Sequence, residues 1–303
     1  MTIADVERDT GLSKDTLRVW ERRYGFPRPR RDAVGERSYP LAQVEKLRVI
    51  KRLMDAGQRP GGLVSRPIAE LHALSGGSRA ALSPHQGLRE DEVDALLALV
   101  RRHDAAGLRR ALALAESRAG LRAFVVDVVA PLNLRVGEAW IRGDLRIFEE
   151  HLYTECVMGV LHSALGSLPP AQGRPRVLLA TLPGEPHGLG LLMAQTMLTL
   201  DDCACLSLGV QVPTADISDA AAAWRADVVA LSVTGCMKNN LVLASLAQLR
   251  GQLPAGMGLW VGGASPALAR RTLDGVTRLP NFDSVADELR TWRTGDTAAP
   301  AGT

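Results

Sequence analysis

A Gly- and Pro-rich loop at residues 181–190 is the stretch that most constrains the fold. The run before it, residues 177–180, has the small and branched apolar side chains of a buried strand, and residues 191–198 have the apolar content of a helix. A strand, a loop and a helix in this order form the repeating unit of an α/β sheet, where ligands bind beyond the strand's carboxyl end. The loop carries His187, two residues after Glu185. A lone loop histidine is ordinarily solvated, so this loop alone identifies no site.

Polar and glycine residues also follow two later apolar runs. Ser232 and Thr234 end the first of these runs, with 41 residues between Gly190 and Ser232. Gly262 and Gly263 end the second, with 27 residues between Thr234 and Gly262. Strands are predicted near residues 176–182, 204–210, 228–234 and 258–262, with a weak fifth near 281–285. Because helical stretches alternate with these strands, residues 174–295 are predicted to form a doubly wound parallel sheet with flavodoxin-like strand order.

These residues together resemble a known cofactor domain. Glu-x-His-x-x-Gly, Ser-x-Thr and Gly-Gly at these spacings resemble the Asp-x-His-x-x-Gly, Ser-x-Leu and Gly-Gly pattern of the cobalamin-binding domains of methionine synthase and the corrinoid mutases. Two positions depart from that pattern: Glu185 stands for Asp and keeps a carboxylate, and Thr234 stands for Leu. The other reading is a domain that keeps this fold without binding cobalamin.

The resemblance implies a role for each motif residue. His187 would be the lower axial ligand of cobalt, and the Glu185 carboxylate would fix its tautomer, as ligating imidazoles require. The displaced base of the cofactor would lie in a slot beside the sheet. The remaining positions that the resemblance assigns to cofactor binding in this domain are Gly190, Ser232, Thr234, Gly262 and Gly263.

Composition limits the class of protein. A chain of 303 residues with 46% hydrophobic and 23% charged residues is typical of a globular protein of two or three domains. We find neither a signal pattern nor an apolar run long enough to cross a bilayer, so a cytoplasmic protein without a membrane partner is expected. The four cysteines lack Cys-x-x-Cys spacing and are expected to be reduced packing residues.

The charge is uneven along the chain. Residues 1–66 contain 15 Lys and Arg against 9 Asp and Glu, although the whole chain has a net charge of only +3. A basic head on a mildly acidic body favours a nucleic-acid-binding end.

The sequence of this head predicts a helix-turn-helix. A short helix over residues 2–9 is followed by a turn at Gly11 and by Ser13, a good N-cap for a second helix. In that helix the apolar and basic side chains fall on different faces, as expected for a helix that enters the major groove. The apolar face has Leu17, Trp20 and Tyr24, and the basic face has Lys14, Arg18 and Arg22.

The stretch Trp-Glu-Arg-Arg-Tyr-Gly at residues 20–25, followed by Gly-x-Arg-x-Tyr at 35–39, resembles the MerR-type winged helix-turn-helix. By position, Arg18 and Arg22 match the groove-facing residues, and Arg37 and Tyr39 match the contacts to the DNA backbone. A wing around residues 32–35 and a helix over 40–56 complete a DNA-binding domain predicted at residues 1–75, with double-stranded promoter DNA as its partner. The alternative is that the arginines form an ordinary solvated helix face.

A Gly-, Pro- and Ser-rich linker is predicted at residues 76–89, after a short helix near 67–74, and a disordered tail at 296–303. Residues 90–170 are predicted to form a four-helix bundle. Its helices are expected over residues 91–103, from the N-cap Asp104 to 118, over 121–140 with a kink at Pro131, and from the N-cap Asp144 to 168.

Trp140 is followed after nine residues by Glu150 and His151. Between a MerR-type head and a cobalamin-type domain, this motif resembles the cobalamin-binding photoreceptor repressors of the CarH and LitR group. There the tryptophan shields the upper ligand's site and the Glu-His pair contacts the adenosyl group. In isolation the three residues read as core and solvated helix surface. One position departs from the group: Ile141 stands where its studied members have a histidine that binds cobalt after light.

The resemblance implies a multidomain transcriptional repressor, not an enzyme, that binds adenosylcobalamin, or else methylcobalamin. It is expected to form a dimer or tetramer whose assembly depends on the upper ligand and on light. The alternatives are a light-independent cobalamin sensor, a cobalamin-free MerR-type regulator and, from another class, a corrinoid methyl-carrier module.

Overall fold

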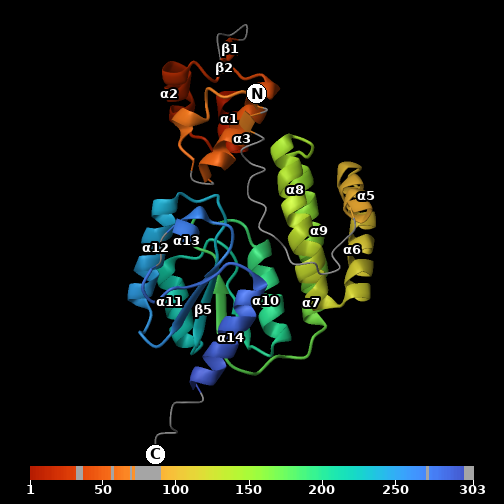
Figure 1. The fold of residues 1–303 in the computed structure, drawn as a ribbon, viewed down its shortest axis with the longest axis vertical. Coiled ribbons are helices and arrows are strands. Elements are labelled where there is room, and N and C mark those ends of the chain that lie inside the picture. The colour runs from red at the N-terminus through yellow and green to blue at the C-terminus, as the bar shows by residue number, and fades with distance from the viewer. Residues whose placement is uncertain (32–36, 56–57, 69, 72–89, 271–272, 297–303) are drawn as a thin grey trace, which may run out of the picture. The chain divides into compact units, whose positions relative to one another are not determined.

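The computed structural model describes residues 1–31, 37–55, 58–68, 70–71, 90–270 and 273–296. The chain divides into two compact units, residues 1–103 with 132–152 and residues 104–131 with 153–303, whose elements Figure 1 traces along the chain. The predicted linker at residues 76–89, the turn of the predicted wing at 32–36 and the tail from 297 lie outside the described residues.

The head begins with the two predicted helices, α1 (Ile3–Thr10) and α2 (Lys14–Tyr24). Gly11 makes the turn between them with a φ of 68°, in the left-handed region that glycine adopts without strain. The Ser13 hydroxyl accepts the N–H of Thr16 and so caps α2, as the sequence predicts. Leu17 and Trp20 on the apolar face are buried, which leaves the opposite face of α2 to solvent.

The rest of the head forms a small two-stranded wing and a third helix. Strand β1 (Arg30–Arg31) pairs antiparallel with β2 (Arg37–Ser38), and α3 (Leu41–Asp55) and a single 3-10 turn, η1 (Pro60–Gly62), follow. Residues 68, 70 and 71 are helical, so the short helix predicted near 67–74 lies only partly within the described residues. The core of the head includes Val6, Leu17, Trp20, Tyr39, Val44, Leu47, Ile50 and Leu53.

The helical middle has the four predicted helical stretches. Helices α5 (Glu90–Arg101), most of α8 (Ala130–Arg142) and the start of α9 (Ile147–Gly166) belong to the first unit. The second unit contains α6 (Ala105–Ala119), α7 (Leu121–Ala123), a π-helical segment η2 (Phe124–Val129) and the remainder of α9. No helix in the described ranges is long and apolar enough to span a bilayer.

Two details of these helices differ from the sequence prediction. Before Pro131 the helix widens into the π segment, with the N–H of Ala130 bonded to the Val125 carbonyl, since proline cannot donate to the regular pattern. Asp144 does not cap α9, because that helix begins only at Ile147. The Glu149 carboxylate instead accepts the N–H of Arg146 at 2.6 Å, which satisfies a free donor at the helix start.

A five-stranded parallel sheet forms the core of the second unit, in the order β4-β3-β5-β6-β7. This order confirms the predicted flavodoxin-like sheet. The first four strands lie where the sequence predicts them, but the fifth is at residues 277–279, not at 281–285. There the Asn281 side chain accepts the N–H of Ser284 and starts the last helix, α14 (Phe282–Asp296). The strands are β3 (Val177–Ala180), β4 (Cys205–Ser207), β5 (Val228–Ser232), β6 (Gly258–Gly262) and β7 (Thr277–Leu279).

Helices cover both faces of this sheet (Figure 1). Helices α10 (Leu189–Leu200) and α14 pack on one face, around Leu191, Trp260 and Leu289. Helices α11 (Thr214–Ala223), α12 (Asn239–Gln252) and α13 (Pro266–Arg270) pack on the other. The strand order reverses at β3, so the loops after β3 and β5 meet at the edge where ligands bind in such folds.

The backbone after β6 lies very close to the backbone after β5 at this edge. Gly263 has a φ of +111°, and a Cβ there would lie 2.2 Å from the Val233 carbonyl oxygen. Gly263→Ala should therefore destabilise the sheet domain by about 2 kcal/mol or more, from strain and steric overlap. The loss would appear as a lower midpoint of thermal unfolding followed by circular dichroism. Gly251→Ala in α12, where a Cβ meets nothing within 4 Å, is the matched control, and equal midpoints for the two variants would contradict the steric argument.

Candidate functional site

The loop after β3 is held to the loop after β5 by a buried carboxylate. Glu185 is 0% exposed, and its Oε2 accepts hydrogen bonds from the Thr234 N–H at 2.6 Å and the Thr234 hydroxyl at 2.8 Å. The Thr181 hydroxyl donates to the Glu185 carbonyl at 2.6 Å. The two loops are therefore joined by charge-assisted hydrogen bonds from residues 49 positions apart in sequence.

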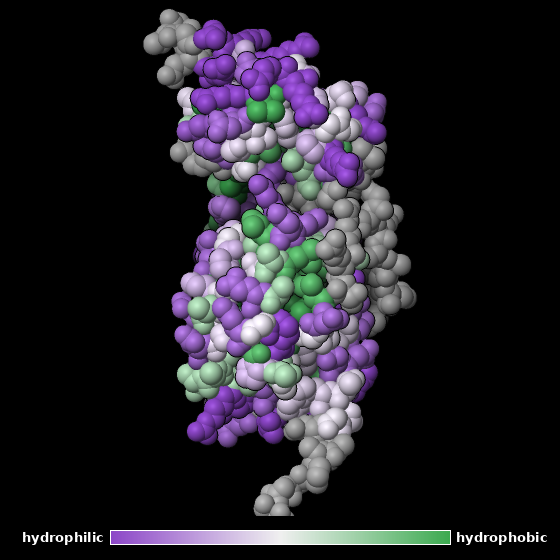
Figure 2. Space-filling view, turned by 90° about the vertical axis from the view of Figure 1, so that its left-hand side faces the viewer, coloured by the Kyte–Doolittle hydropathy of each residue, from purple (hydrophilic) through white to green (hydrophobic). Residues whose placement is uncertain are grey.

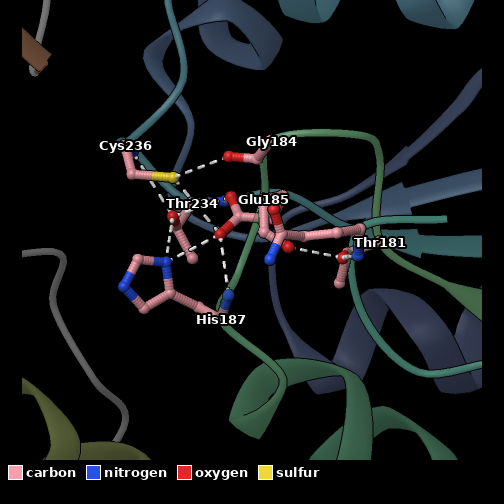
Figure 3. A network of polar contacts seen from close by, with 7 residues as sticks. Thr181, Gly184, Glu185, His187, Thr234 and Cys236 are labelled. Carbon is pink, nitrogen blue, oxygen red and sulfur yellow. Dashed lines mark hydrogen bonds and ion pairs between the residues drawn. The ribbon is translucent and has the colours of Figure 1, made fainter. Parts of the chain in front are cut away.

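The second oxygen of this carboxylate orients His187. Glu185 Oε1 accepts the His187 N–H at 3.1 Å and lies 2.7 Å from ring Nδ1. Figure 3 shows the other ring nitrogen on the side away from the carboxylate, and the side chain is 54% exposed. An imidazole with Nδ1 held by a carboxylate and Nε2 directed outward is the arrangement that metal-ligating histidines use.

The two groups shift each other's titration. Burial raises the pKa of Glu185, but hydrogen bonds from His187 and Thr234 outweigh it and hold the pKa below the ordinary carboxyl value. Hydrogen bonds to the Cys236 sulfur and to Glu185, against the effect of burial, raise the pKa of the His187 imidazole to about 10. The imidazole must lose one proton before Nε2 can ligate a metal.

Cys236 is a member of this cluster that the sequence reasoning missed. Its sulfur lies 3.3 Å from Glu185 Oε1, and its N–H donates to the Thr234 hydroxyl at 3.3 Å (Figure 3). The sequence predicts all four cysteines to be packing residues, whereas this one is half-buried beside a histidine and a carboxylate. The available signal was its position two residues after the Ser-x-Thr motif.

The glycines of the motif are explained by packing within the protein. A Cβ at Gly190 would lie 2.9 Å from the Ser232 hydroxyl, and one at Gly262 would lie 3.3 Å from the Leu279 carbonyl oxygen. Gly263 is excluded from bearing a side chain by the Val233 carbonyl. The parallel pairing of β3, β5 and β6 brings the motif residues to one edge of the sheet, and a ligand role for the glycines stays a prediction.

The helical middle also reaches the histidine loop within the second unit. A Cβ at Gly188 would lie 3.1 Å from Val210 Cγ1 and 3.9 Å from Met158 Cε. Met158 is in the part of α9 that belongs to this unit, and the sequence reasoning did not single it out. A thioether fits irregular apolar space, so Met158 is placed to pack against this loop.

The predicted upper-face residues lie in the first unit. Trp140 is half-buried on α8, where Ile141 follows it, and Glu150 and His151 are on the first turns of α9. His151 Nδ1 lies 2.7 Å from Glu150 Oε2, and the two side chains are 71% and 30% exposed. The structure therefore brings this Glu-His pair together within its own unit.

The basic face of α2 is open to solvent, as predicted. Arg18 and Arg22 are exposed, and Arg18 Nη1 lies 3.3 Å from Asp15 Oδ1 in a pair whose two side chains are 55% and 89% exposed. Lys14 pairs with Glu7 at 3.6 Å. Exposed ion pairs of this kind are weak, so the side chains of Arg18 and Lys14 are available to a DNA phosphate. Figure 2 shows mainly hydrophilic residues over the head.

The two residues predicted to contact the DNA backbone, Arg37 and Tyr39, differ in their exposure to solvent. Arg37 Nε donates to Glu21 Oε2 at 3.2 Å and remains partly exposed. Tyr39 is 1% exposed, and its hydroxyl is buried with no partner among the described residues. Burial raises the pKa of the Tyr39 hydroxyl, with the Glu21 charge adding to the effect. This burial argues against a direct phosphate contact, because Tyr39 packs into the core of the head.

Comparison with known proteins agrees with this architecture. Residues 1–63 match the MerR HTH family regulatory proteins, and residues 92–163 and 175–283 match two B12 binding domain families. The chain is 34% identical over 261 residues to the HTH-type transcriptional repressor CarH of Myxococcus xanthus, covering 84% of this chain and 86% of that protein. The chain belongs to the CarH family of MerR-type transcriptional repressors.

A second member of this family, the HTH-type transcriptional repressor CarA of Myxococcus xanthus, is 32% identical over 77% of this chain and 76% of its own length. The monomethylamine corrinoid protein of Methanosarcina barkeri has the same fold over 67% of this chain and all of its own, with a TM-score of 0.53 and 16% identity. The CarH-family member described here is thus a DNA-binding regulator with a cobalamin-binding domain. This confirms the predicted family, fold class and cofactor class.

Substitution of the buried carboxylate tests the hydrogen-bond network directly. Glu185→Gln removes the negative charge that favours the His187 imidazolium. It also turns an amide N–H₂, which cannot accept a hydrogen bond, toward the donors of either Thr234 or His187. The pKa of His187 should fall from about 10 by at least about one unit. Titration of the imidazole signals by NMR measures the shift. Glu150→Gln, which removes the partner of His151, is the control that should leave His187 unchanged. An unaltered His187 titration in Glu185→Gln would exclude the carboxylate as its orienting group.

Proposed function

We propose that this protein is a light-responsive repressor that binds adenosylcobalamin and changes its oligomeric state with the upper ligand of cobalt. The observation that carries the proposal is the pairing of His187 Nδ1 with the buried Glu185 carboxylate at 2.7 Å, at the ligand-binding edge of the sheet. Membership of the CarH family adds a DNA-binding head whose occupancy such a site would control.

His187 is the proposed lower axial ligand. Glu185 holds Nδ1, so Nε2 is the nitrogen offered to cobalt, and the N–H of His187 donates to the same carboxylate and fixes the loop. Ser232 is 7% exposed beside Gly190 and is proposed to hydrogen-bond the base that His187 displaces. Thr234 holds Glu185 in place, which gives the Ser-x-Thr departure from Ser-x-Leu a structural role.

The proposed sensor of the upper ligand is the group Trp140, Glu150 and His151. Bound adenosylcobalamin supplies a cobalt–carbon bond that light cleaves. Trp140 would cover the alkyl group, and the Glu150–His151 pair would contact its polar atoms. A ligand shifts assembly only by interacting differently with two states, so loss of these contacts must favour a different packing of the helical middle.

Ile141 sets this member apart from the group it resembles. Its side chain has no donor atom, so we propose that the state after illumination lacks a histidine ligand from this position. Water, or a donor from another residue, would then complete the cobalt coordination. A light-independent sensor of cobalamin and a cobalamin-free regulator are the alternatives within the family. A corrinoid methyl carrier is the alternative from another class, and cobalamin-dependent methyl transfer would favour it.

The test is an absorption spectrum and a size-exclusion profile of the full chain with adenosylcobalamin, recorded in the dark and again after green light. We expect a retained cofactor whose spectrum shows histidine coordination, and an oligomer that dissociates on illumination. Retention without a change in size would contradict the light response, and no retention would contradict cofactor binding. His187→Ala should lose the histidine-coordinated spectrum.

Trp140→Ala tests the coupling between the upper ligand and assembly. The variant should keep the spectrum set by His187 while its elution volume no longer depends on light. Trp292→Ala, on α14 in the second unit, is the matched aromatic control and should retain the light-dependent change in size. Identical elution shifts in Trp140→Ala and the unmodified protein would refute the role of Trp140.

DNA binding is proposed to use Lys14, Arg18 and Arg22 on α2, with Arg37 on the wing. Arg22→Ala should weaken operator binding and, if it contacts a phosphate, reduce the slope of log K against log salt by about one. Electrophoretic shifts at several salt concentrations give both quantities. Arg118→Ala, at an exposed position of α6, is the charge-matched control. Equal operator affinity for both variants would count against α2 as the recognition helix.

A further inference from the structure

The cluster at the sheet edge contains one reactive group that the proposed function does not use. Cys236 Sγ lies 3.3 Å from Glu185 Oε1 and 3.9 Å from the Gly184 carbonyl oxygen. One ligand atom each from Glu185, His187 and Cys236 lies within 4.8 Å of the other two. Among the described residues this is the group of three whose donor atoms converge closely enough to hold a metal ion.

We propose that in the cobalamin-free protein Glu185, His187 and Cys236 bind a divalent transition-metal ion, with Zn²⁺ the best fit. A carboxylate oxygen, an imidazole nitrogen and a thiolate are the donors that Zn²⁺ takes in tetrahedral sites with three protein ligands and one water. Metal–donor bonds of about 2.0–2.3 Å place tetrahedral ligand atoms roughly 3.3–3.8 Å apart. The Cys236–Glu185 distance of 3.3 Å already matches, and the His187–Glu185 pair must open from 2.7 Å.

The protons balance without any further reactant. The Cys236 thiol and the Nδ1 position of His187 each release their proton to solvent as the ion binds, since only thiolate and neutral imidazole ligate. The Glu185 and Cys236 charges then neutralise the two positive charges of the ion. Thr234 keeps its two hydrogen bonds to Glu185 Oε2, which leaves Oε1 for the metal.

The other cysteines do not offer this chemistry. Burial raises the pKa of the Cys203 thiol to about 12 and that of Cys205 to about 11, and Cys156 is buried with its pKa raised by desolvation. None of these three belongs to the converging group of the described residues. Cys236 is half-buried in a loop, where a small ion can reach it.

Metal binding has a consequence for cofactor uptake, and this step rests on the proposed function. A neutral imidazole has one nitrogen lone pair, so a metal on Nδ1 leaves the proton on Nε2, the nitrogen proposed for cobalt. His187 therefore cannot ligate the proposed ion and the cobalt of cobalamin at the same time. The cofactor-free site would be protected by the ion, and cobalamin would have to displace it.

The experiment uses the full chain, stripped of metal with a chelator and kept reduced. Co²⁺ is the spectroscopic probe, because thiolate coordination adds a near-ultraviolet charge-transfer band and tetrahedral geometry adds strong visible bands. Zn²⁺ affinity is then measured by competition with a chromophoric chelator. Cys236→Ser should abolish the charge-transfer band and weaken Zn²⁺ binding at least about tenfold, whereas Cys205→Ser should leave both unchanged.

The second measurement is cobalamin uptake with and without one equivalent of Zn²⁺. We expect Zn²⁺ to slow histidine-coordinated binding in the unmodified protein but not in Cys236→Ser, which still binds cobalamin. Absence of the charge-transfer band, or equal Zn²⁺ affinity in Cys236→Ser, overturns the metal site even if cobalamin binds normally. Failure of the metal-free protein to bind cobalamin overturns the proposed function, and the Co²⁺ spectrum separately decides the metal site.

Discussion

The site depends on one carboxylate that is buried without being neutralised. Glu185 is fully buried, and removing it from water would raise its pKa if nothing compensated. Hydrogen bonds from Thr234 and His187 supply that compensation and hold it ionised. The hydrogen bonds from Thr234 connect the loops after β3 and β5, where the strand order reverses. The same carboxylate therefore holds these two loops together and orients the His187 imidazole.

The sequence predicts the sheet well because its signals are local. The runs at β3, β5 and β6 are apolar and bounded by Gly, Pro and polar residues, and right-handed parallel connections leave few ways to order them. The fifth strand was misplaced because β7 has only three residues, one of them Arg278, and shows no clear apolar run. The start of α9 was misplaced because Glu149, not Asp144, satisfies its first donors.

Contacts between distant residues were not predictable in the same way. Spacing suggested that Glu185 and His187 act together, but nothing local indicates that Cys236, 51 residues from Glu185, reaches the same oxygen. The resemblance assigns the motif glycines to cofactor binding, whereas the fold shows a Cβ at Gly190 meeting the Ser232 hydroxyl and one at Gly263 meeting the Val233 carbonyl. In the head, Tyr39 matched a DNA-contact motif, and only the folded core shows that its ring is buried.

A carboxylate that orients a histidine is a general device, but its length affects what else it can do. Glu185 is one methylene longer than the Asp of the resembling pattern, and it places Oε1 between the imidazole and the Cys236 sulfur while Oε2 stays on Thr234. One oxygen therefore maintains the fold while the other faces two further donors. In the proposed metal site a ligand binds at Oε1 while the two hydrogen bonds from Thr234 to Oε2 keep the loops joined.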